Sequence, residues 1–342
     1  MVDGLDLDAL SGWLAREAPG LLDGPLSADL ITGGKSNLTY AVSDGRTEVV
    51  VRRPPLGHVL ATAHDMGREH RVMSALAGTG VPVPATYGHC EDPEVIGAPF
   101  YVMERVGGTP FARASQIEPL GPERTATIVG RMVDVLADLH AVDPAAVGLG
   151  DFGRPEGYLE RQVRRWKKQL AASHSREIPR MDELVAKLER ELPSGGDGTI
   201  VHGDYRLDNV LVDDSPEGGD RVTAVLDWEM STLGDPLTDV ALLLAYQQLG
   251  EVAPQGGTAV VTDVARAPGY PSRDDVLQRY AERSGRDFSD IDFHVALAFF
   301  KLAVILEGIH YRHTHGQTLG DGFEGIGDYI GPLVEMGLQS RS

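Results

Sequence analysis

Cysteine is nearly absent from this chain of 342 residues, which contains only Cys90. A single cysteine cannot form an intramolecular disulfide and cannot build a metal site from several thiolates. We interpret Cys90 as a small buried residue without a chemical role. Such low cysteine usage suits a reducing compartment, and we expect a cytoplasmic location.

Positive charge is also scarce, because 31 Lys and Arg residues stand against 51 Asp and Glu residues and the formal net charge is -20. An electrostatic field of one sign repels polyanions over distances longer than local contacts. We therefore expect no general affinity for nucleic acid and none for an anionic membrane. The sequence does not determine the oligomeric state.

Long apolar runs are missing as well. The N-terminal stretch MVDGLDLDALSGW has neither the basic segment nor the hydrophobic stretch of a signal peptide. The most apolar helical stretch, residues 295–309, contains Lys301 and Glu307 and is shorter than a membrane span. We predict that it is a buried helix, since 42% hydrophobic content allows a large core.

A β-hairpin and a helix are predicted in the first hundred residues. Residues 38–43 and 48–52 have the alternation of strands, and a turn at Asp44 and Gly45 joins them. The segment HDMGREHRVMSAL then has the apolar spacing of a helix. The segments PATYGHC and FYVMERV predict two further short strands.

The pattern becomes mainly helical beyond Gly107 and Gly108. We therefore predict an α+β fold with two lobes. A small antiparallel-sheet lobe would cover residues 1–104, and a larger, mainly helical lobe would cover residues 105–342. The chain length fits one large two-lobed unit or two domains.

The stretch HGDYRLDN, residues 202–209, concentrates charge between two apolar strands. The strand that follows this stretch, NVLV, is succeeded by residues 213–220, which have the composition of a hairpin tip. A further strand, RVTAVLDW, then ends at Asp227. Such a hairpin would bring Asn209 and Asp227 together at its open end. An amide oxygen and a carboxylate suit Mg²⁺, which takes few protein oxygens together with substrate phosphates. Asp204 could then orient a hydroxyl nucleophile or accept its proton, as phosphoryl transfer requires.

The run HGDYRLDN followed by LDWE resembles the catalytic and metal-binding segments of the aminoglycoside phosphotransferase and choline kinase family, which has a protein-kinase-like fold. The longer run from HGDYRLDNVLV to LGDPLTDVA is most similar to the subgroup related to the kinase-like domain of acyl-CoA dehydrogenase fusion proteins. The resemblance extends over most of the chain. It implies transfer of the γ-phosphoryl group of ATP, with Mg²⁺, to a hydroxyl group of a small molecule.

The resemblance implies roles for several polar residues of this run. Asp204 is similar to the catalytic base, Asn209 to the first metal ligand and Asp227 to the second. Arg206 is a candidate to neutralise charge on the transferred phosphoryl group. Three further residues are expected to support the loop structurally: His202, Asp235 and Asp239.

The segment TGGKSN is implied to contact the nucleotide. A Walker A loop also ends in GKS. However, Asp29 stands where that loop needs a glycine, and a strand follows in place of a helix. We therefore reject a P-loop. Gly33, Gly34, Ser36 and Asn37 would form a tight turn between strands whose backbone donors and Ser36 hydroxyl approach the phosphates.

The family lysine on the next strand is replaced by arginine. The strand VVVRRPP offers Arg52 and Arg53, and we choose Arg52 because alternation points it the same way as Val50. Its partner on the crossing helix would be Glu69. Arginine keeps the positive charge but changes reach and geometry. The alternative is an exposed Arg-Arg pair at the end of an edge strand.

The segment FYVMERVGG ends where the pattern changes, and the resemblance implies a hinge between lobes there. Backbone groups of Glu104 and Val106 would bind adenine, and Met103 would line the pocket. A strand that enters a Gly-Gly turn without any such role fits the same residues.

Three functions stay open at this level. The basic cluster in YLERQVRRWKKQL and the subgroup resemblance favour a hydroxylated acyl-CoA or a similar metabolite as acceptor, although the cluster also fits a solvated helix face. The acidic composition favours a cationic acceptor such as an aminoglycoside. A pseudokinase that binds nucleotide without turnover is disfavoured by the intact set of Asp204, Asn209 and Asp227.

Overall fold

The computed structural model describes residues 4–31, 37–56, 65–173, 176–195, 198–252, 257–258, 261–317 and 323–340. The chain forms two compact units. The first comprises Met1–Gly108 together with Thr223–Ser231, and the second comprises Thr109–Val222 together with Thr232–Ser342. A segment from the middle of the chain therefore belongs to the N-terminal unit.

The first unit contains a five-stranded antiparallel sheet in the order β1-β2-β3-β5-β4. Its strands are β1 (Ser27–Leu30), β2 (Leu38–Ser43), β3 (Glu48–Arg53), β4 (Thr86–Cys90) and β5 (Phe100–Glu104). The predicted hairpin is confirmed, since β2 and β3 pair in register from Leu38 opposite Arg53 to Ser43 opposite Glu48. Asp44 closes the turn by accepting the amides of Arg46 and Thr47 at 2.8 Å each.

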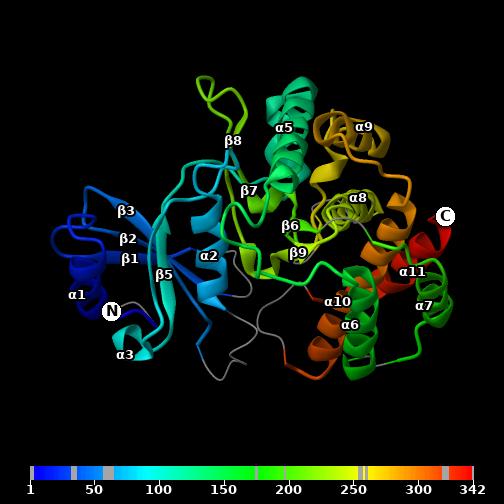
Figure 1. Ribbon diagram of the computed structural model, residues 1–342, viewed down its shortest axis with the longest axis horizontal. Coiled ribbons are helices and arrows are strands. Elements are labelled where there is room, and N and C mark those ends of the chain that lie inside the picture. Colours follow the sequence, from blue (N-terminus) through cyan, green and yellow to red (C-terminus); the bar gives the residue numbers. More distant parts are fainter. Residues whose placement is uncertain are drawn as a thin grey trace. The chain divides into compact units, whose positions relative to one another are not determined.

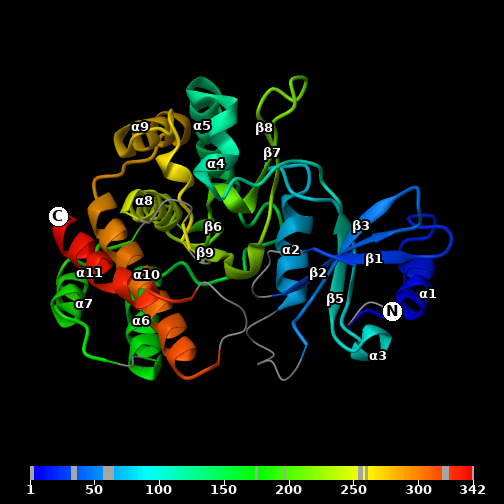
Figure 2. The same ribbon diagram turned by 180° about the vertical axis from the view of Figure 1, so that it is seen from behind.

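Helices α1 (Leu7–Glu17) and α2 (Met66–Leu76) cover opposite faces of this sheet (Figures 1 and 2). Because side chains alternate along a strand, Val49 and Val51 join the core under α1, where they pack with Leu10, Trp13 and Phe100. The same alternation separates the two arginines at the end of β3. Arg53 lies on the α1 side and donates to the carbonyl of Ile96 at 2.9 Å, next to the short helix α3 (Pro93–Ile96).

The second unit is mainly helical. Its helices are α4 (Ala114–Ile117), α5 (Pro122–Ala141), α6 (Tyr158–Ser173), α7 (Met181–Arg190), α8 (Leu237–Val252), α9 (Arg273–Ser284), α10 (Ile291–Thr314) and α11 (Ile330–Gln339). Helix α10 packs against α6, α8 and α11 (Figure 2). Strands β6 (Thr199–Val201) and β9 (Thr232–Gly234) form a short antiparallel pair.

Helix α10 has 24 residues and extends at both ends beyond the apolar stretch 295–309. By length and composition it could cross a membrane, with a mean hydropathy of 1.6, so the expectation that this stretch is too short was wrong. In the structure, 78% of the apolar 18-residue window of this helix is buried inside the protein. The prediction of a buried helix is thus confirmed.

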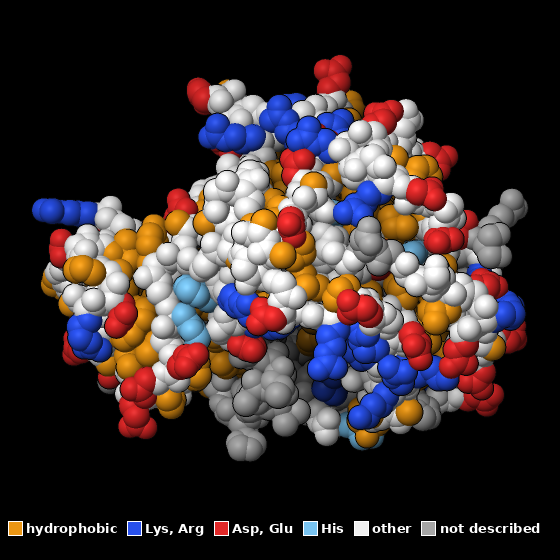
Figure 3. Space-filling model, viewed as in Figure 1, with side chains coloured by type: hydrophobic (Ala, Val, Ile, Leu, Met, Phe, Trp, Pro, Cys, Tyr) orange, Lys and Arg blue, Asp and Glu red, His pale blue; other side chains and the backbone are white. Residues whose placement is uncertain are grey.

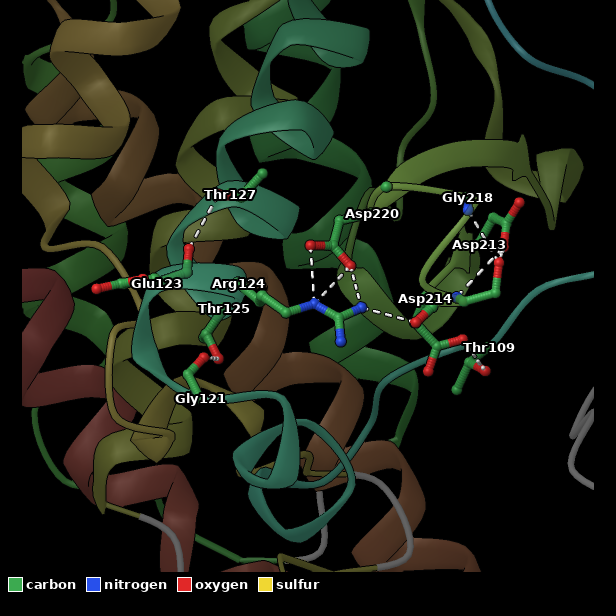
Figure 4. Close-up of polar contacts among 12 residues, drawn as sticks. Thr109, Gly121, Glu123, Arg124, Thr125, Thr127, Asp213, Asp214, Gly218 and Asp220 are labelled. Atoms are coloured by element: carbon green, nitrogen blue, oxygen red, sulfur yellow. Dashed lines mark hydrogen bonds and ion pairs between the residues drawn. The ribbon is translucent and has the colours of Figure 1, made fainter.

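The hairpin predicted around residues 213–220 is present as β7 (Val210–Asp213) and β8 (Arg221–Val225). The amide of Asp220 donates to the carbonyl of Asp213 at 3.0 Å and closes the tip. Arg124 of α5 holds this tip, because its Nε contacts both carboxylate oxygens of Asp220 at 3.1 and 3.0 Å and its Nη2 donates to the carbonyl of Asp214 at 2.6 Å (Figure 4). The strand that begins directly after Asn209 is therefore anchored at its far end.

Candidate active site

The loop that follows β6 is held by a buried carboxylate at the start of α8. Asp239 accepts the amide of His202 through Oδ2 at 2.6 Å and the amide of Gly203 through Oδ1 at 2.8 Å. His140 lies 3.2 Å from the same Oδ2. Burial acts to raise the pKa of Asp239, but the hydrogen bond and charge of His140, the charge of His202 and the Gly203 amide outweigh it, so this pKa is lowered.

Two further contacts fix the loop. The amide of Asp204 donates to Nδ1 of His202 at 3.2 Å, so His202 bonds the loop backbone as predicted. Gly203 has φ of 86°, a left-handed conformation that suits glycine. Asp235, the other residue expected to support the loop, accepts the amide of Leu237 at 3.0 Å in the first turn of α8.

Asp204 and Asn209 lie together in the second unit. Nδ2 of Asn209 donates to the backbone carbonyl of Asp204 at 2.9 Å and to its Oδ2 at 3.2 Å. Both side chains are therefore fixed relative to each other across the four intervening residues. With its nitrogen bonded to Asp204, Asn209 can offer its amide oxygen to a hard cation.

Arg206 is engaged on two sides. Its Nε and Nη2 contact Oδ1 and Oδ2 of Asp208 at 2.5 Å each, and its guanidinium carbon lies 4.4 Å from the ring centroid of Tyr246. Burial acts to lower the pKa of Arg206, but the charges of Asp208, Tyr246 and Asp204 raise it well above the ordinary value. Arg206 is thus a permanent cation beside Asp204, with two of its donors used by Asp208.

Two residues at this loop escaped the sequence reasoning. The hydroxyl of Tyr246, on α8, donates to Oδ1 of Asp204 at 2.8 Å, and Nζ of Lys301, on α10, donates to the carbonyl of Gly203 at 2.7 Å. Burial lowers the pKa of Lys301, although the Asp204 charge opposes this. The only sequence feature that could have pointed to Tyr246 or Lys301 is that each places a polar group in a mainly apolar helix. Lys301 also lines a cavity of about 40 Å³ beside Gly203, together with Trp166.

In the first unit, Arg52 is surrounded by carboxylates. Its Nε lies 3.3 Å from Oε2 of Glu69, and its Nη2 lies 2.5 Å from Oδ1 of Asp227. Glu69 also accepts from the hydroxyl of Tyr101 at 3.0 Å and from Nδ2 of Asn37 at 3.2 Å. The structure therefore pairs Glu69 with Arg52, the arginine chosen from the strand alternation.

Glu69 is almost fully buried, with 1% of its surface exposed. Burial raises its pKa to about 7; the positive charge of Arg52 opposes this shift, and the nearby Asp227 and Glu229 charges reinforce it. Burial acts to lower the pKa of Arg52, but Tyr101, Glu69 and Asp227 raise it above the ordinary value. The pair thus combines a permanent cation with a carboxyl that titrates near neutral pH.

Asp227 has a left-handed backbone conformation, with φ of 65°. This conformation is uncommon outside glycine, and residues held in it occur often at functional sites. The following residue secures it, because the buried ring of Trp228 donates from Nε1 to the carbonyl of Val225 at 3.0 Å. The Asp227 side chain remains 30% exposed, so it can accept a ligand in addition to Arg52.

Of the turn predicted to contact the phosphates, the structure describes Asn37. Gly33, Gly34 and Ser36 lie outside the described residues. Asn37 is buried and donates from Nδ2 to Glu229 at 3.3 Å as well as to Glu69.

The hinge candidates lie at the end of β5. Met103 is buried, with 6% exposure, and the amide of Glu104 already donates to the carbonyl of Ala85 at 2.8 Å. Val106 follows the strand in an irregular segment before Gly107.

The candidate metal ligands are divided between the units, with Asn209 in the second and Asp227 in the first. Within the described parts of the chain, no group of three or more His, Cys, Asp or Glu side chains gathers as a metal site. The donor set proposed from the sequence, one amide oxygen and one carboxylate, still has the chemistry that Mg²⁺ accepts.

The small antiparallel sheet with its crossing helix and the mainly helical second unit define an α+β fold of the protein-kinase-like class. The model of the phosphotransferase enzyme family matches residues 27–277, and the chain belongs to this family. Acyl-CoA dehydrogenase family member 11 of Rattus norvegicus is 36% identical over 340 residues, which is 98% of this chain and 43% of that protein. The chain thus spans less than half the length of this relative.

Solved structures agree with this assignment. The crystal structure of a putative aminoglycoside phosphotransferase from Ralstonia eutropha is 37% identical, with a TM-score of 0.83 and coverage of 98% of both chains. An aminoglycoside phosphotransferase in a ternary complex with ADP and hygromycin B has a TM-score of 0.63 at 13% identity, with coverage of 98% of this chain and 99% of that chain, and shares the fold.

Proposed function

We propose that this phosphotransferase moves the γ-phosphoryl group of ATP to a hydroxyl group of a small molecule in the presence of Mg²⁺. The observation that carries the proposal is the Asp204 carboxylate, which is held by Tyr246 and Asn209 in a loop braced by Asp239. Phosphoryl transfer requires little covalent chemistry from the protein, so catalysis depends mainly on positioning, and a base held in a fixed place provides it.

The reaction needs one proton transfer. Asp204 would orient the acceptor hydroxyl and take its proton as the new oxygen–phosphorus bond forms and the bond from the γ-phosphorus to the bridging oxygen breaks, which releases ADP. Asn209 and Asp227 would each supply an oxygen to the metal ion, whose charge offsets that of the phosphates. Arg52, held by Glu69, and backbone groups of Glu104 and Val106 would bind the nucleotide, and Met103 would line the adenine pocket.

A hydroxylated acyl-CoA or a similar metabolite is the acceptor class that we favour. The relative from Rattus norvegicus belongs by name to the acyl-CoA dehydrogenases. Helix α6 adds a basic surface, and Figure 3 shows Lys and Arg side chains gathered where this helix lies. Its apolar residues Leu159, Val163 and Trp166 are buried, which leaves the basic ones outside.

Two of these basic residues already have acidic partners, since Arg164 pairs with Glu160 at 3.1 Å and Lys167 pairs with Glu189. Arg165 and Lys168 form no ion pair among the described residues, and they would meet an anionic acceptor. An aminoglycoside acceptor is the second candidate, which the net charge of -20 and the Ralstonia eutropha relative favour. The intact Asp204, Asn209 and Asp227 count against a pseudokinase.

The test is an ATP-consumption screen with Mg²⁺ against hydroxylated acyl-CoAs, aminoglycosides, macrolides, choline and sugars. With the acceptor that is found, Asp204→Ala should lower kcat by roughly 10² or more while nucleotide affinity stays nearly the same. The matched control is Asp182→Ala, which removes an exposed carboxylate from the first turn of α7. Full turnover in Asp204→Ala would show that another group is the base. If no acceptor on the panel supported ATP consumption, the protein would lack the proposed activity.

A further inference from the structure

The Asp204 carboxylate has a different partner on each oxygen. Oδ2 accepts from Asn209, which lies in the same loop, at 3.2 Å. Oδ1 accepts from the hydroxyl of Tyr246, which lies 42 residues later in the chain on α8, at the shorter distance of 2.8 Å. The stronger of the two contacts therefore comes from outside the loop.

Tyr246 is itself fixed in place. It projects from a helix whose other residues are mostly buried and apolar, including Leu242 and Leu243. The guanidinium carbon of Arg206 lies 4.4 Å from the centroid of its ring, and Asp208 accepts from Nε and Nη2 of that guanidinium at 2.5 Å each. A cation above an aromatic ring stabilises the ring's position. The hydroxyl is thus presented to Asp204 by a rigid helix and by a stacked cation.

The hydroxyl acts as a donor in this contact. Burial raises the pKa of Tyr246 above its ordinary value, the Asp204 charge adds to this, and the nearby Arg206 opposes it. A phenol that keeps its proton donates to the carboxylate, and hydrogen bonds to a charged acceptor are the stronger kind. Asn209 bonds only Oδ2 of this carboxylate, so Tyr246 supplies the hydrogen bond that Oδ1 accepts.

We propose that Tyr246 is a positioning residue for the phosphoryl-transfer reaction, because its hydrogen bond to Oδ1 fixes the plane of the Asp204 carboxylate. An ionised carboxylate has about four lone-pair positions, and the two partners occupy one on each oxygen. The remaining positions then point in one set of directions, so an acceptor hydroxyl meets the base in a single geometry. This inference rests on the proposed function and adds a residue that the catalytic motif does not contain.

Tyr246→Phe tests the proposal because it removes one oxygen and keeps the ring below Arg206. We expect kcat to fall about tenfold, the scale of a modest misplacement of a reacting group, while KM for ATP and for the acceptor changes less than twofold. In the Asp204→Ala background the same change should cause no further loss, because Tyr246 acts only through that carboxylate. Unchanged kcat, a change confined to KM, or an equal loss in both backgrounds would overturn the proposal.

A matched control separates positioning from stability. Thr125→Val removes a buried hydroxyl that donates to the carbonyl of Gly121 at 3.0 Å, in the same unit but in α5. We expect a similar small decrease in Tm for both variants and a fall in kcat only for Tyr246→Phe. If both variants lost activity in proportion to Tm, Tyr246 would be a structural residue.

A readout without turnover keeps this inference distinct from the proposed function. Crystal structures of the wild type and of Tyr246→Phe should show one Asp204 rotamer in the former and at least two in the latter. An identical single rotamer in both structures would overturn the positioning role. If no acceptor were phosphorylated, the proposed function would fail, and the rotamer comparison would still decide whether Tyr246 fixes Asp204.

Discussion

At the scale of single residues, Glu69 is the side chain whose protonation should change the stability of the fold. Burial raises its pKa to about 7 from the ordinary 4.5. The folded protein therefore binds this proton more tightly than the unfolded chain does. The resulting stabilisation is present below pH 4.5 and is lost as the pH rises through about 7.

Glu69→Gln should remove this pH dependence while keeping the size of the side chain. A shift of this size predicts that the wild type loses roughly 2 kcal/mol of unfolding free energy between pH 5 and pH 8 relative to the variant. Urea denaturation at several pH values measures the difference. Glu94→Gln, a change at an exposed glutamate of α3, is the control that should follow the wild type. Parallel curves for the wild type and Glu69→Gln would contradict the raised pKa.

The predictability of individual residues depended on whether a local pattern contained them. Asp204 and Asn209 stand five positions apart in one motif, and the structure brings them into contact. Arg52 could be separated from Arg53 because alternation along a strand decides which face each side chain takes. Tyr246 and Lys301 could not be found in this way, since each reaches the loop from a distant helix and its contact depends on tertiary packing.

At the scale of elements, the hairpin of β7 and β8 depends on Arg124 for its attachment to α5. The guanidinium binds the Asp220 carboxylate and the Asp214 carbonyl together (Figure 4). Arg124→Met keeps the aliphatic stem and removes all of these contacts. We expect the amide of Asp220 to exchange with solvent several-fold faster in this variant, because the tip can then open locally.

Hydrogen exchange followed by NMR measures this opening. The control is Arg221→Met, which removes a more exposed ion pair with Asp213 at 3.1 Å from the same hairpin. Its effect on the Asp220 amide should be smaller, since the Arg221 side chain is 65% exposed and the Arg124 side chain is 37% exposed. Equal exchange in the wild type and in Arg124→Met would mean that the hairpin holds its tip without α5.

Elements with strong periodicity were predictable, and those that depend on pairing were less so. The alternation of β2 and β3 predicted the hairpin to within one residue, because each strand has one face in the core. Strands β6 and β9 have only three residues each, so their pairing across the chain leaves no periodic signal.

At the scale of the whole molecule, the net charge of -20 opposes the binding of an anionic nucleotide. Asp227 adds a local negative charge in the first unit, although Arg52 offsets part of it. Under the proposed function, a metal ion turns this carboxylate from a repelling group into a ligand. The sign of the effect of Asp227 on ATP affinity should therefore depend on Mg²⁺.

Asp227→Asn tests this reversal without disturbing the backbone, because asparagine tolerates the left-handed conformation at φ of 65°. With Mg²⁺ the variant should bind ATP roughly tenfold more weakly than the wild type, since it loses a charged ligand worth about 1.4 kcal/mol. With EDTA it should bind ATP equally or more tightly, because a repelling charge is gone. Calorimetric titration under both conditions measures the two affinities.

Glu229→Gln is the control, because it removes a carboxylate 3.9 Å from Arg52 that is not a proposed metal ligand, so it should show no reversal. The same dependence on Mg²⁺ in Asp227→Asn and in the wild type would exclude Asp227 as a metal ligand.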